Sequence, residues 1–439
     1  MSLSENDYTA FGRLRTNMDQ QTTEMDRQLD HSPAVESIDE RTATVPWRSR
    51  TVQIVLTSTA LAPLGVPLIS PALPVFRDVF AITDAQASLL VSTYFLVGIV
   101  LSPFIGILAD RIGRKRVLVA GLLAFGVLGG AMAIAPTFEA LLALRIAQGT
   151  AAAAIFITTV TIVGDAFDGV QRTAVLGANV AVLSATAALF PVLGGALAGI
   201  AWNAPFLAYL AAIPIAAFAQ VALEEPTRPA GDRGIAALAD ATRAVVTLPL
   251  VALFAVSFLT EFLLFGVVFT AMPFVLAATF APVVIGGVIL AAGTASMVAA
   301  AASGRLARSL SNEWLIALGF ASYAVGFAGA WVADGLLATT GALVVVGVGV
   351  GLLMPVVDAA VSERVSTEYL AGAMSLRNST TFLGRTTGPI AFVGLAISLG
   401  VGYQPLLLVS SLVAVAATGV AVVAGPLGLA RAAGRHSPA

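Results

Sequence analysis

Apolar runs of about 20 residues recur along most of the chain and are separated by short polar segments. An α-helix rises about 1.5 Å per residue, so a run of this length crosses the roughly 30 Å hydrocarbon core of a bilayer. The runs lack the alternation of a membrane barrel strand, and backbone polar groups in lipid must pair within their own segment. The pattern predicts an all-α membrane protein with twelve spans, at residues 51–76, 86–108, 117–135, 138–163, 173–200, 204–223, 247–275, 282–303, 314–333, 336–357, 371–398 and 404–425.

The polar segment at residues 224–246 is the longest interruption between spans, and it divides them six and six. The two sets are related by an internal repeat, because Gly106 and Gly304 are 198 residues apart and so are Pro191 and Pro389. Two similar bundles are the plan of transporters that rock around a central site. The predicted parts are a disordered tail (1–46), a six-helix bundle (47–223), a linker (224–246), a second six-helix bundle (247–425) and a second tail (426–439).

Basic residues are distributed unevenly between the two sides of this arrangement. If the amino terminus is cytoplasmic, the inner segments hold nineteen of the 23 Lys and Arg residues, and the outer loops hold only Arg77. Basic residues near span ends favour the cytoplasmic side. We therefore expect a multi-pass protein of the plasma (cytoplasmic) membrane, with both termini in the cytoplasm.

Composition excludes several other classes of protein. Only 11% of the residues are charged, against about 25% in soluble domains. Cysteine is absent, and the two histidines, His31 and His436, lie in the tails, so we expect neither a metal site nor a thiol nucleophile. With no phosphate-binding loop either, we expect no enzyme, no cofactor and no nucleic-acid partner, but a monomer in a lipid bilayer.

The loop after the second span reads GILADRIGRKRVL, which resembles the signature G-x-L-a-D-R-x-G-R-[RK] of the major facilitator superfamily (MFS). A glycine in such a motif lets helices approach closely, and basic residues anchor the loop at the inner leaflet. The resemblance implies that Asp110 meets the start of the eleventh helix, near Ala371 and Gly372, and latches the cytoplasmic side closed. The alternative is an ordinary basic loop with turn glycines. The candidate latch residues are Gly106, Asp110, Arg111, Gly113, Arg114 and Lys115.

Two further motifs carry the resemblance toward the drug/proton antiporter branch. Arg145 and Gln148, in LRIAQG, resemble an R-x-x-Q-G motif whose arginine is associated with proton coupling in the family. The alternative is an arginine that only holds helices together. LFPVLGG resembles the antiporter motif, although Phe190 stands where the first glycine is usual. The candidate helix-packing residues are Pro191, Gly194, Gly195, Gly388 and Pro389.

Ionisable groups inside the spans are the strongest candidates for a functional site, because lipid disfavours them. Glu261 is the only carboxylate well inside a span, at about the same depth as Arg145 and Arg385. Burial favours the protonated form of a carboxylate and an arginine partner favours the ionised form, so making or breaking such a pair would move a proton. We hypothesise a proton-coupling site in which Glu261 pairs with Arg385 or Arg145. A permanent ion pair that fixes packing is the alternative.

The substrate is less well defined by the sequence. Arg377, Thr381 and Arg385 lie on one side of the eleventh span, and a positive interior would favour an anion. Phenylalanines around Glu261 could instead line a cavity for hydrophobic compounds, or they could simply pack: Phe258, Phe262, Phe265 and Phe269.

Together these features predict a secondary active transporter that moves a small solute by alternating access. Proton-coupled efflux of hydrophobic or drug-like compounds ranks first. Transport of an organic anion or metabolite by symport or uniport, and a transporter-like receptor, are the alternatives.

Overall fold

The structure is a computed structural model that describes residues 44–225 and 247–434. The predicted disordered tail lies outside the described residues up to residue 43, as does the predicted linker from residue 226 onward. All regular elements in the described ranges are helices. The predicted all-α fold is therefore confirmed.

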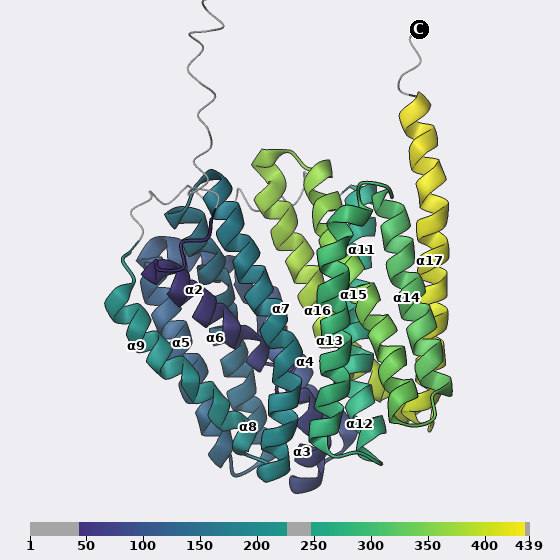
Figure 1. Ribbon diagram of the computed structural model, residues 1–439. Coiled ribbons are helices and arrows are strands. Elements are labelled where there is room, and N and C mark those ends of the chain that lie inside the picture. Colours follow the sequence, from purple (N-terminus) through teal and green to yellow (C-terminus); the bar gives the residue numbers. More distant parts are fainter. Residues whose placement is uncertain (1–43, 226–246, 435–439) are drawn as a thin grey trace, which may run out of the picture.

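The first half runs from α2 to α9 (Figure 1). Two of its helices begin at a threonine that caps the helix: Thr83 accepts a hydrogen bond from the Gln86 amide before α4, and Thr137 accepts one from the Ala140 amide before α6. The α-helices of this half are α2 (Arg50–Leu61), α3 (Leu73–Val79), α4 (Asp84–Ile112), α5 (Arg114–Ala131), α6 (Phe138–Ala166), α7 (Gly169–Ile200), α8 (Ala204–Leu207) and α9 (Ala212–Ala222).

The second half runs from α11 to α17 and includes a π-helix at Leu264–Ala271 between its first two α-helices. The last helix continues to Gly434, past the predicted span end at residue 425. The α-helices are α11 (Leu248–Leu263), α12 (Met272–Ala277), α13 (Pro282–Leu306), α14 (Asn312–Val332), α15 (Leu336–Arg364), α16 (Thr367–Ser398) and α17 (Tyr403–Gly434).

Nine helices in the described ranges are long and apolar enough to cross a membrane, or ten if the bent α4 is taken as one span. Two of the predicted spans do not meet that criterion. Residues 51–76 form α2, two 3₁₀ turns and α3, whereas the sequence predicted one continuous helix. Prolines at 63, 67, 71 and 74 explain the break, because each lacks an N–H donor and clashes with the preceding turn. The other is α16, whose apolar character is interrupted by Arg377 and Arg385.

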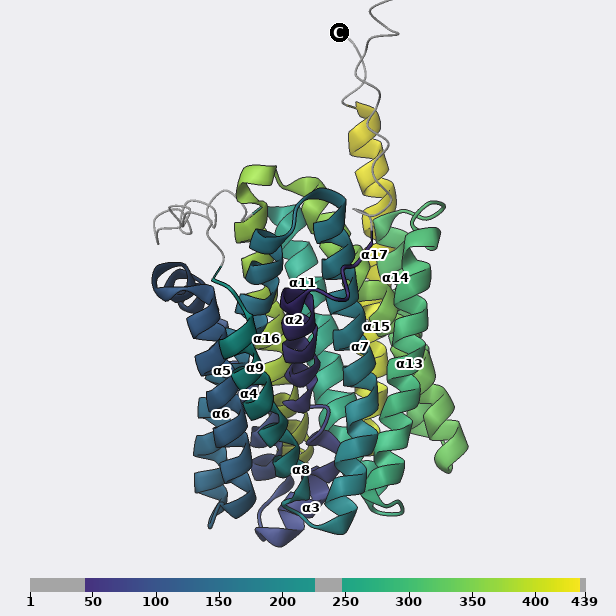
Figure 2. The same cartoon turned by 60° about the vertical axis from the view of Figure 1, so that its left-hand side comes forward.

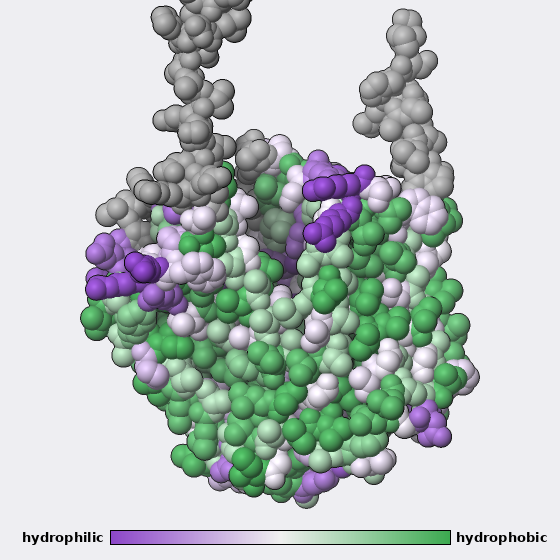
Figure 3. Space-filling model, viewed as in Figure 1, coloured by the Kyte–Doolittle hydropathy of each residue, from purple (hydrophilic) through white to green (hydrophobic). Residues whose placement is uncertain are grey.

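The two halves meet along two helix pairs, α7 with α13 and α4 with α16 (Figures 1 and 2). We call the end where α2 begins and α17 ends the terminal end, at the top of Figure 1, and the opposite end, with α3, α8 and α12, the far end. Figure 3 shows the surface hollowed between the halves at the terminal end.

The surroundings of the glycines also show that the helices pack closely at the far end and leave open space at the terminal end. A Cβ atom on Gly195 of α7 would collide with the backbone of Pro282, and one on Gly286 of α13 would collide with the backbone of Pro191, so these helices touch backbone to backbone near the far end. Gly106 and Gly304, near the terminal end, have no described atom within 4 Å of a built Cβ. Among the described residues, therefore, no close helix approach is seen at Gly106.

Candidate functional site

Glu261 and Arg385 form an ion pair between α11 and α16. The Arg385 Nε and Nη2 atoms donate to the two Glu261 carboxylate oxygens at 2.9 and 3.1 Å. The helices can approach this closely because Gly384 and Gly388 of α16 face the α11 backbone, where a Cβ would meet the carbonyl oxygens of Phe258 and Phe262. The Glu261 side chain is 2% exposed and that of Arg385 is 26% exposed, so the carboxylate lies behind the guanidinium.

Three phenyl rings surround this pair. The Arg385 Cζ atom lies 5.3 Å from the ring centroid of Phe95, 5.1 Å from that of Phe265 and 5.8 Å from that of Phe382. These distances are within the range of cation–π attraction. Phe95 comes from α4 in the first half, whereas the other two rings belong to the second half, so the site joins both halves of the molecule.

The predicted aromatic residues divide into two groups. Phe265 stands at the ion pair and packs on Phe269, with ring centroids 4.9 Å apart. Phe258 and Phe262 stack on each other at 5.6 Å, and Phe262 also contacts Phe392 of α16. Phe265 is therefore the member of the predicted set that contacts Arg385, while Phe95 and Phe382 were missed, because only the fold shows that their helices meet here.

Arg145 of α6 is fully buried and lies in a different network. Its guanidinium donates to the Gly65 carbonyl oxygen, to the Leu90 carbonyl oxygen at 2.8 Å, to Gln148 Oε1 at 2.8 Å and to the Tyr209 hydroxyl at 3.1 Å. The Gly65 carbonyl belongs to the break between α2 and α3. Of the two partners proposed for Glu261, the structure places Arg385 beside it and gives Arg145 to this network.

Arg377 of α16 pairs with Asp358 of α15, with Nε and Oδ1 3.2 Å apart. The Asp358 side chain is 42% exposed and that of Arg377 is 7% exposed. Asp358 lies six residues before the end of α15, just beyond the predicted span 336–357, so this pair stands at the terminal edge of the bundle. Together with the Glu261–Arg385 pair, this makes two neutral ion pairs, and Arg145 remains as a cation held by carbonyl and hydroxyl oxygens.

The candidate latch loop joins α4 to α5 and lines a cavity of about 600 Å³. Arg114 bridges two carboxylates, Asp110 at 3.0 Å and Asp165 at the end of α6. Glu225, just after α9, accepts from the backbone amides of Arg114 and Lys115 at the start of α5, where the helix dipole favours a negative charge. Sequence reasoning missed Asp165 and Glu225 because both stand at the ends of other spans. The side chain of Ala371 lies outside the described residues, so the predicted contact of Asp110 with α16 remains a prediction.

The predicted packing residues lie at close backbone contacts. A Cβ on Gly194 would collide with the Leu68 backbone in the break between α2 and α3, and Gly195 faces α13. Pro191 and Pro389 are buried within α7 and α16. No group of His, Cys, Asp and Glu residues within the described ranges could hold a metal ion.

Comparison with known proteins agrees with this fold. Over 351 residues the chain is 28% identical to the bacillibactin exporter of Bacillus subtilis, covering 76% of this chain and 86% of the exporter. It is 30% identical over 155 residues to the quinolone resistance protein NorA of Staphylococcus aureus, covering 35% of this chain and 40% of NorA. A bacterial homolog of the human lysosomal transporter Spinster has the same fold, with a TM-score of 0.69 at 15% identity, and the match covers 86% of this chain and 94% of the homolog. The sequence profile of the Major Facilitator Superfamily matches residues 55–389, and the chain therefore belongs to this family of membrane transporters.

Proposed function

We propose that this transporter couples proton movement to the efflux of hydrophobic or drug-like compounds. The pair of Glu261 and Arg385 is the observation that carries the proposal, since it joins a buried carboxylate at membrane depth to a partly exposed cation among aromatic rings. An aromatic site of this kind suits apolar or planar compounds. The name of the bacillibactin exporter supports export, and that of the quinolone resistance protein NorA supports a drug-like substrate.

The proton would act on the ion pair. While Glu261 is ionised, Arg385 neutralises it, and the pair presents no net charge to a hydrophobic substrate. A proton on Glu261 removes the attraction that holds Arg385 in place, and the guanidinium and the rings around it can then rearrange. Because Phe95 belongs to the other half, such a rearrangement would also alter the contact between the halves.

Charge balance separates this proposal from anion transport. The sequence suggested a positive interior, but Arg385 and Arg377 are paired with carboxylates, and Arg145 is 1% exposed and bonded to four oxygen acceptors. The described part of the site therefore offers an anion no unpaired arginine. An anion substrate would first have to displace Glu261 from Arg385.

The experiment is proton-driven transport by purified protein in proteoliposomes, with a quinolone and bacillibactin as the test compounds. We expect Glu261→Gln to abolish transport driven by a pH gradient but to keep exchange of labelled for unlabelled compound, because glutamine cannot release a proton. Glu313→Gln, at a surface ion pair with Arg364, serves as the control. Unchanged pH-driven transport in Glu261→Gln would exclude the coupling role, and absence of exchange in the unaltered protein would favour a receptor.

A further inference from the structure

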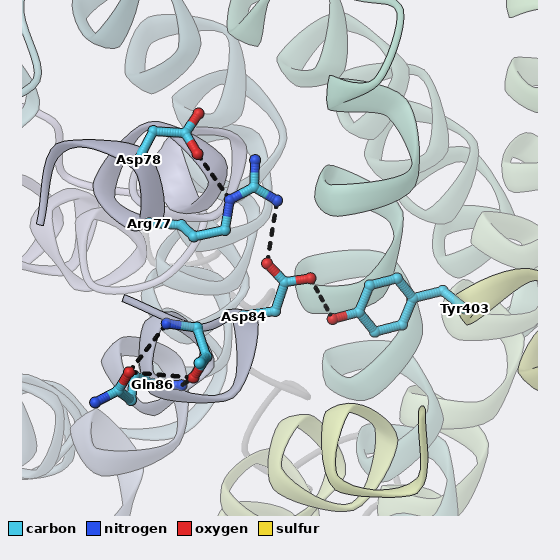
Figure 4. A network of polar contacts seen from close by, with 6 residues as sticks. Arg77, Asp78, Asp84, Gln86 and Tyr403 are labelled. Atoms are coloured by element: carbon cyan, nitrogen blue, oxygen red, sulfur yellow. Dashed lines mark hydrogen bonds and ion pairs between the residues drawn. The ribbon is translucent and has the colours of Figure 1, made fainter. Parts of the chain in front are cut away.

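A polar network at the far end connects the two halves of the molecule (Figure 4). Asp84, in the first turn of α4, accepts hydrogen bonds from Arg77 Nη1 at 3.1 Å and from the Tyr403 hydroxyl at 2.7 Å. Arg77 and Asp84 belong to the first half, whereas Tyr403 begins α17 in the second half. Each Asp84 oxygen therefore has a different donor, and one of the two donors comes from the opposite half.

An aromatic contact closes this network into a ring. The Phe274 ring of α12 stacks on Tyr403, with centroids 5.8 Å apart and planes 17° apart. The Arg77 Cζ atom lies 5.9 Å from the Phe274 centroid, so Arg77 contacts the second half as well. The ring of contacts runs from Asp84 to Tyr403, Phe274 and Arg77 and back to Asp84, and it crosses between the halves twice.

Local structure holds these side chains in position. Thr83 and Gln86 form a reciprocal capping box that fixes the first turn of α4, and the helix dipole there favours the Asp84 carboxylate. Asp78 also accepts from Arg77, at 2.8 Å, but it lies on α3 next to Arg77 and makes no link to the other half. The hydrogen bond to Asp78, together with that to Asp84, raises the pKa of the Arg77 guanidinium above its ordinary value, so Arg77 stays charged.

We infer that a second latch, separate from the candidate latch loop between α4 and α5, holds the far end closed and sets the proportion of molecules open on that side. It consists of Asp84, Arg77, Tyr403 and Phe274. The inference rests on the proposed alternating access, because a transporter that opens at the far end must separate α3 and α4 from α12 and α17. Opening breaks the Asp84–Tyr403 hydrogen bond and the Arg77–Phe274 contact together. The latch is thus released as a unit.

The test measures the distance between the halves and does not depend on transport. Spin labels are placed at Glu139→Cys and Asp334→Cys, two exposed far-end positions in opposite halves that are outside the network; the chain has no cysteine of its own. We expect Asp84→Asn and Tyr403→Phe to shift the population toward longer distances by about tenfold relative to the unaltered protein, as the loss of a hydrogen bond to a charged group would. Tyr403→Phe keeps the ring stacked on Phe274, which preserves packing.

Asp78→Asn is the matched control, because it also removes a carboxylate from Arg77 but breaks no contact between halves. The latch is refuted if Asp84→Asn and Tyr403→Phe give the same distance distribution as Asp78→Asn. A shift in distances together with unaltered pH-driven transport in Glu261→Gln would support the latch while rejecting the proposed coupling site. The two proposals therefore fail independently.

Discussion

Arg145 and Arg385 are both arginines within apolar helices, but the atoms around them differ. Arg145 is 1% exposed and bonds to two backbone carbonyl oxygens, an amide oxygen and a tyrosine hydroxyl, none of which is a carboxylate. Arg385 is 26% exposed and bonds to a carboxylate, which can take up a proton. Arg145 accordingly holds the first-half break together, and Arg385 has the environment of a group that responds to protonation.

This difference predicts opposite effects of the same substitution. Lysine keeps the charge but cannot reproduce the fork geometry of a guanidinium. Arg145→Lys would leave buried acceptors without donors, at about 1–3 kcal/mol each. We expect its melting temperature in detergent to fall by on the order of 3 °C or more.

Arg385→Lys is the comparison variant. We expect a small change in melting temperature, since one ammonium group still neutralises Glu261. We expect a large loss of pH-driven transport, since lysine cannot reproduce the paired hydrogen bonds of the guanidinium. Intrinsic tryptophan fluorescence follows unfolding, and proteoliposome assays follow transport. If Arg145→Lys melts normally yet loses pH-driven transport selectively, Arg145 has the coupling role that its motif implies in the family.

Sequence reasoning located the charged residues of the site but could not choose their partners. Charged residues in apolar spans are conspicuous, which is why Glu261, Arg145 and Arg385 could be named. Which arginine faces Glu261 depends on how each helix is rotated about its axis and on the glycine contacts of α16. The hydropathy pattern of the sequence reveals neither of these. Tyr209, which bonds Arg145 from outside any motif, was not identifiable for the same reason.

Two irregular segments occupy corresponding positions in the repeat. The break at 62–72 and the π-helix at Leu264–Ala271 overlap when the 198-residue offset is applied, and they touch where the Ser70 hydroxyl donates to the Phe269 carbonyl at 2.6 Å. Phe269 lies four residues before Pro273, which has no N–H to donate to it, so Ser70 supplies the missing donor. The four prolines are a sequence signal of the first irregularity, but the span at 51–76 was predicted as one continuous helix. Only Pro273 hinted at the second.

At the level of the helix pair, α7 and α13 offer a controlled test of the far-end contact. Gly286 and Gly287 are neighbours on α13, but a Cβ on Gly286 would collide with the Pro191 backbone, whereas one on Gly287 would meet nothing within 4 Å. Both changes to alanine gain similar helix propensity, up to about 1 kcal/mol. We expect Gly287→Ala to be neutral or stabilising.

We expect Gly286→Ala to cost about 1–3 kcal/mol through overpacking and to shift the Glu139–Asp334 label distances toward the far-open form. Melting curves and the same spin-label pair measure both effects. Equal behaviour of the two alanine variants would show that the backbone contact between α7 and α13 does not stabilise the closed far end.

For the whole molecule, contacts are unevenly distributed between the two ends. The far end has the Asp84–Tyr403 hydrogen bond, the Arg77–Phe274 contact and the glycine contacts of α7 with α13. The terminal end has the hollow of Figure 3 and open space beside Gly106 and Gly304. This is the arrangement of a transporter open on one side. The orientation of the chain in the membrane decides whether the open end faces the cytoplasm or the exterior.

Orientation is predicted from the basic residues and can be measured directly, because the chain has no native cysteine that would react with a thiol reagent. Glu139→Cys lies at the far end and Ser309→Cys in the basic loop after α13 at the terminal end, and both positions are exposed. Nineteen of the 23 basic residues favour a cytoplasmic terminal end. In intact cells, a membrane-impermeant maleimide should therefore label Glu139→Cys within minutes and should label Ser309→Cys only after permeabilisation. That result would make the conformation inward-facing and would place the Asp84 latch on the outer side, whereas the reverse labelling would put the hollow at the terminal end on the outside.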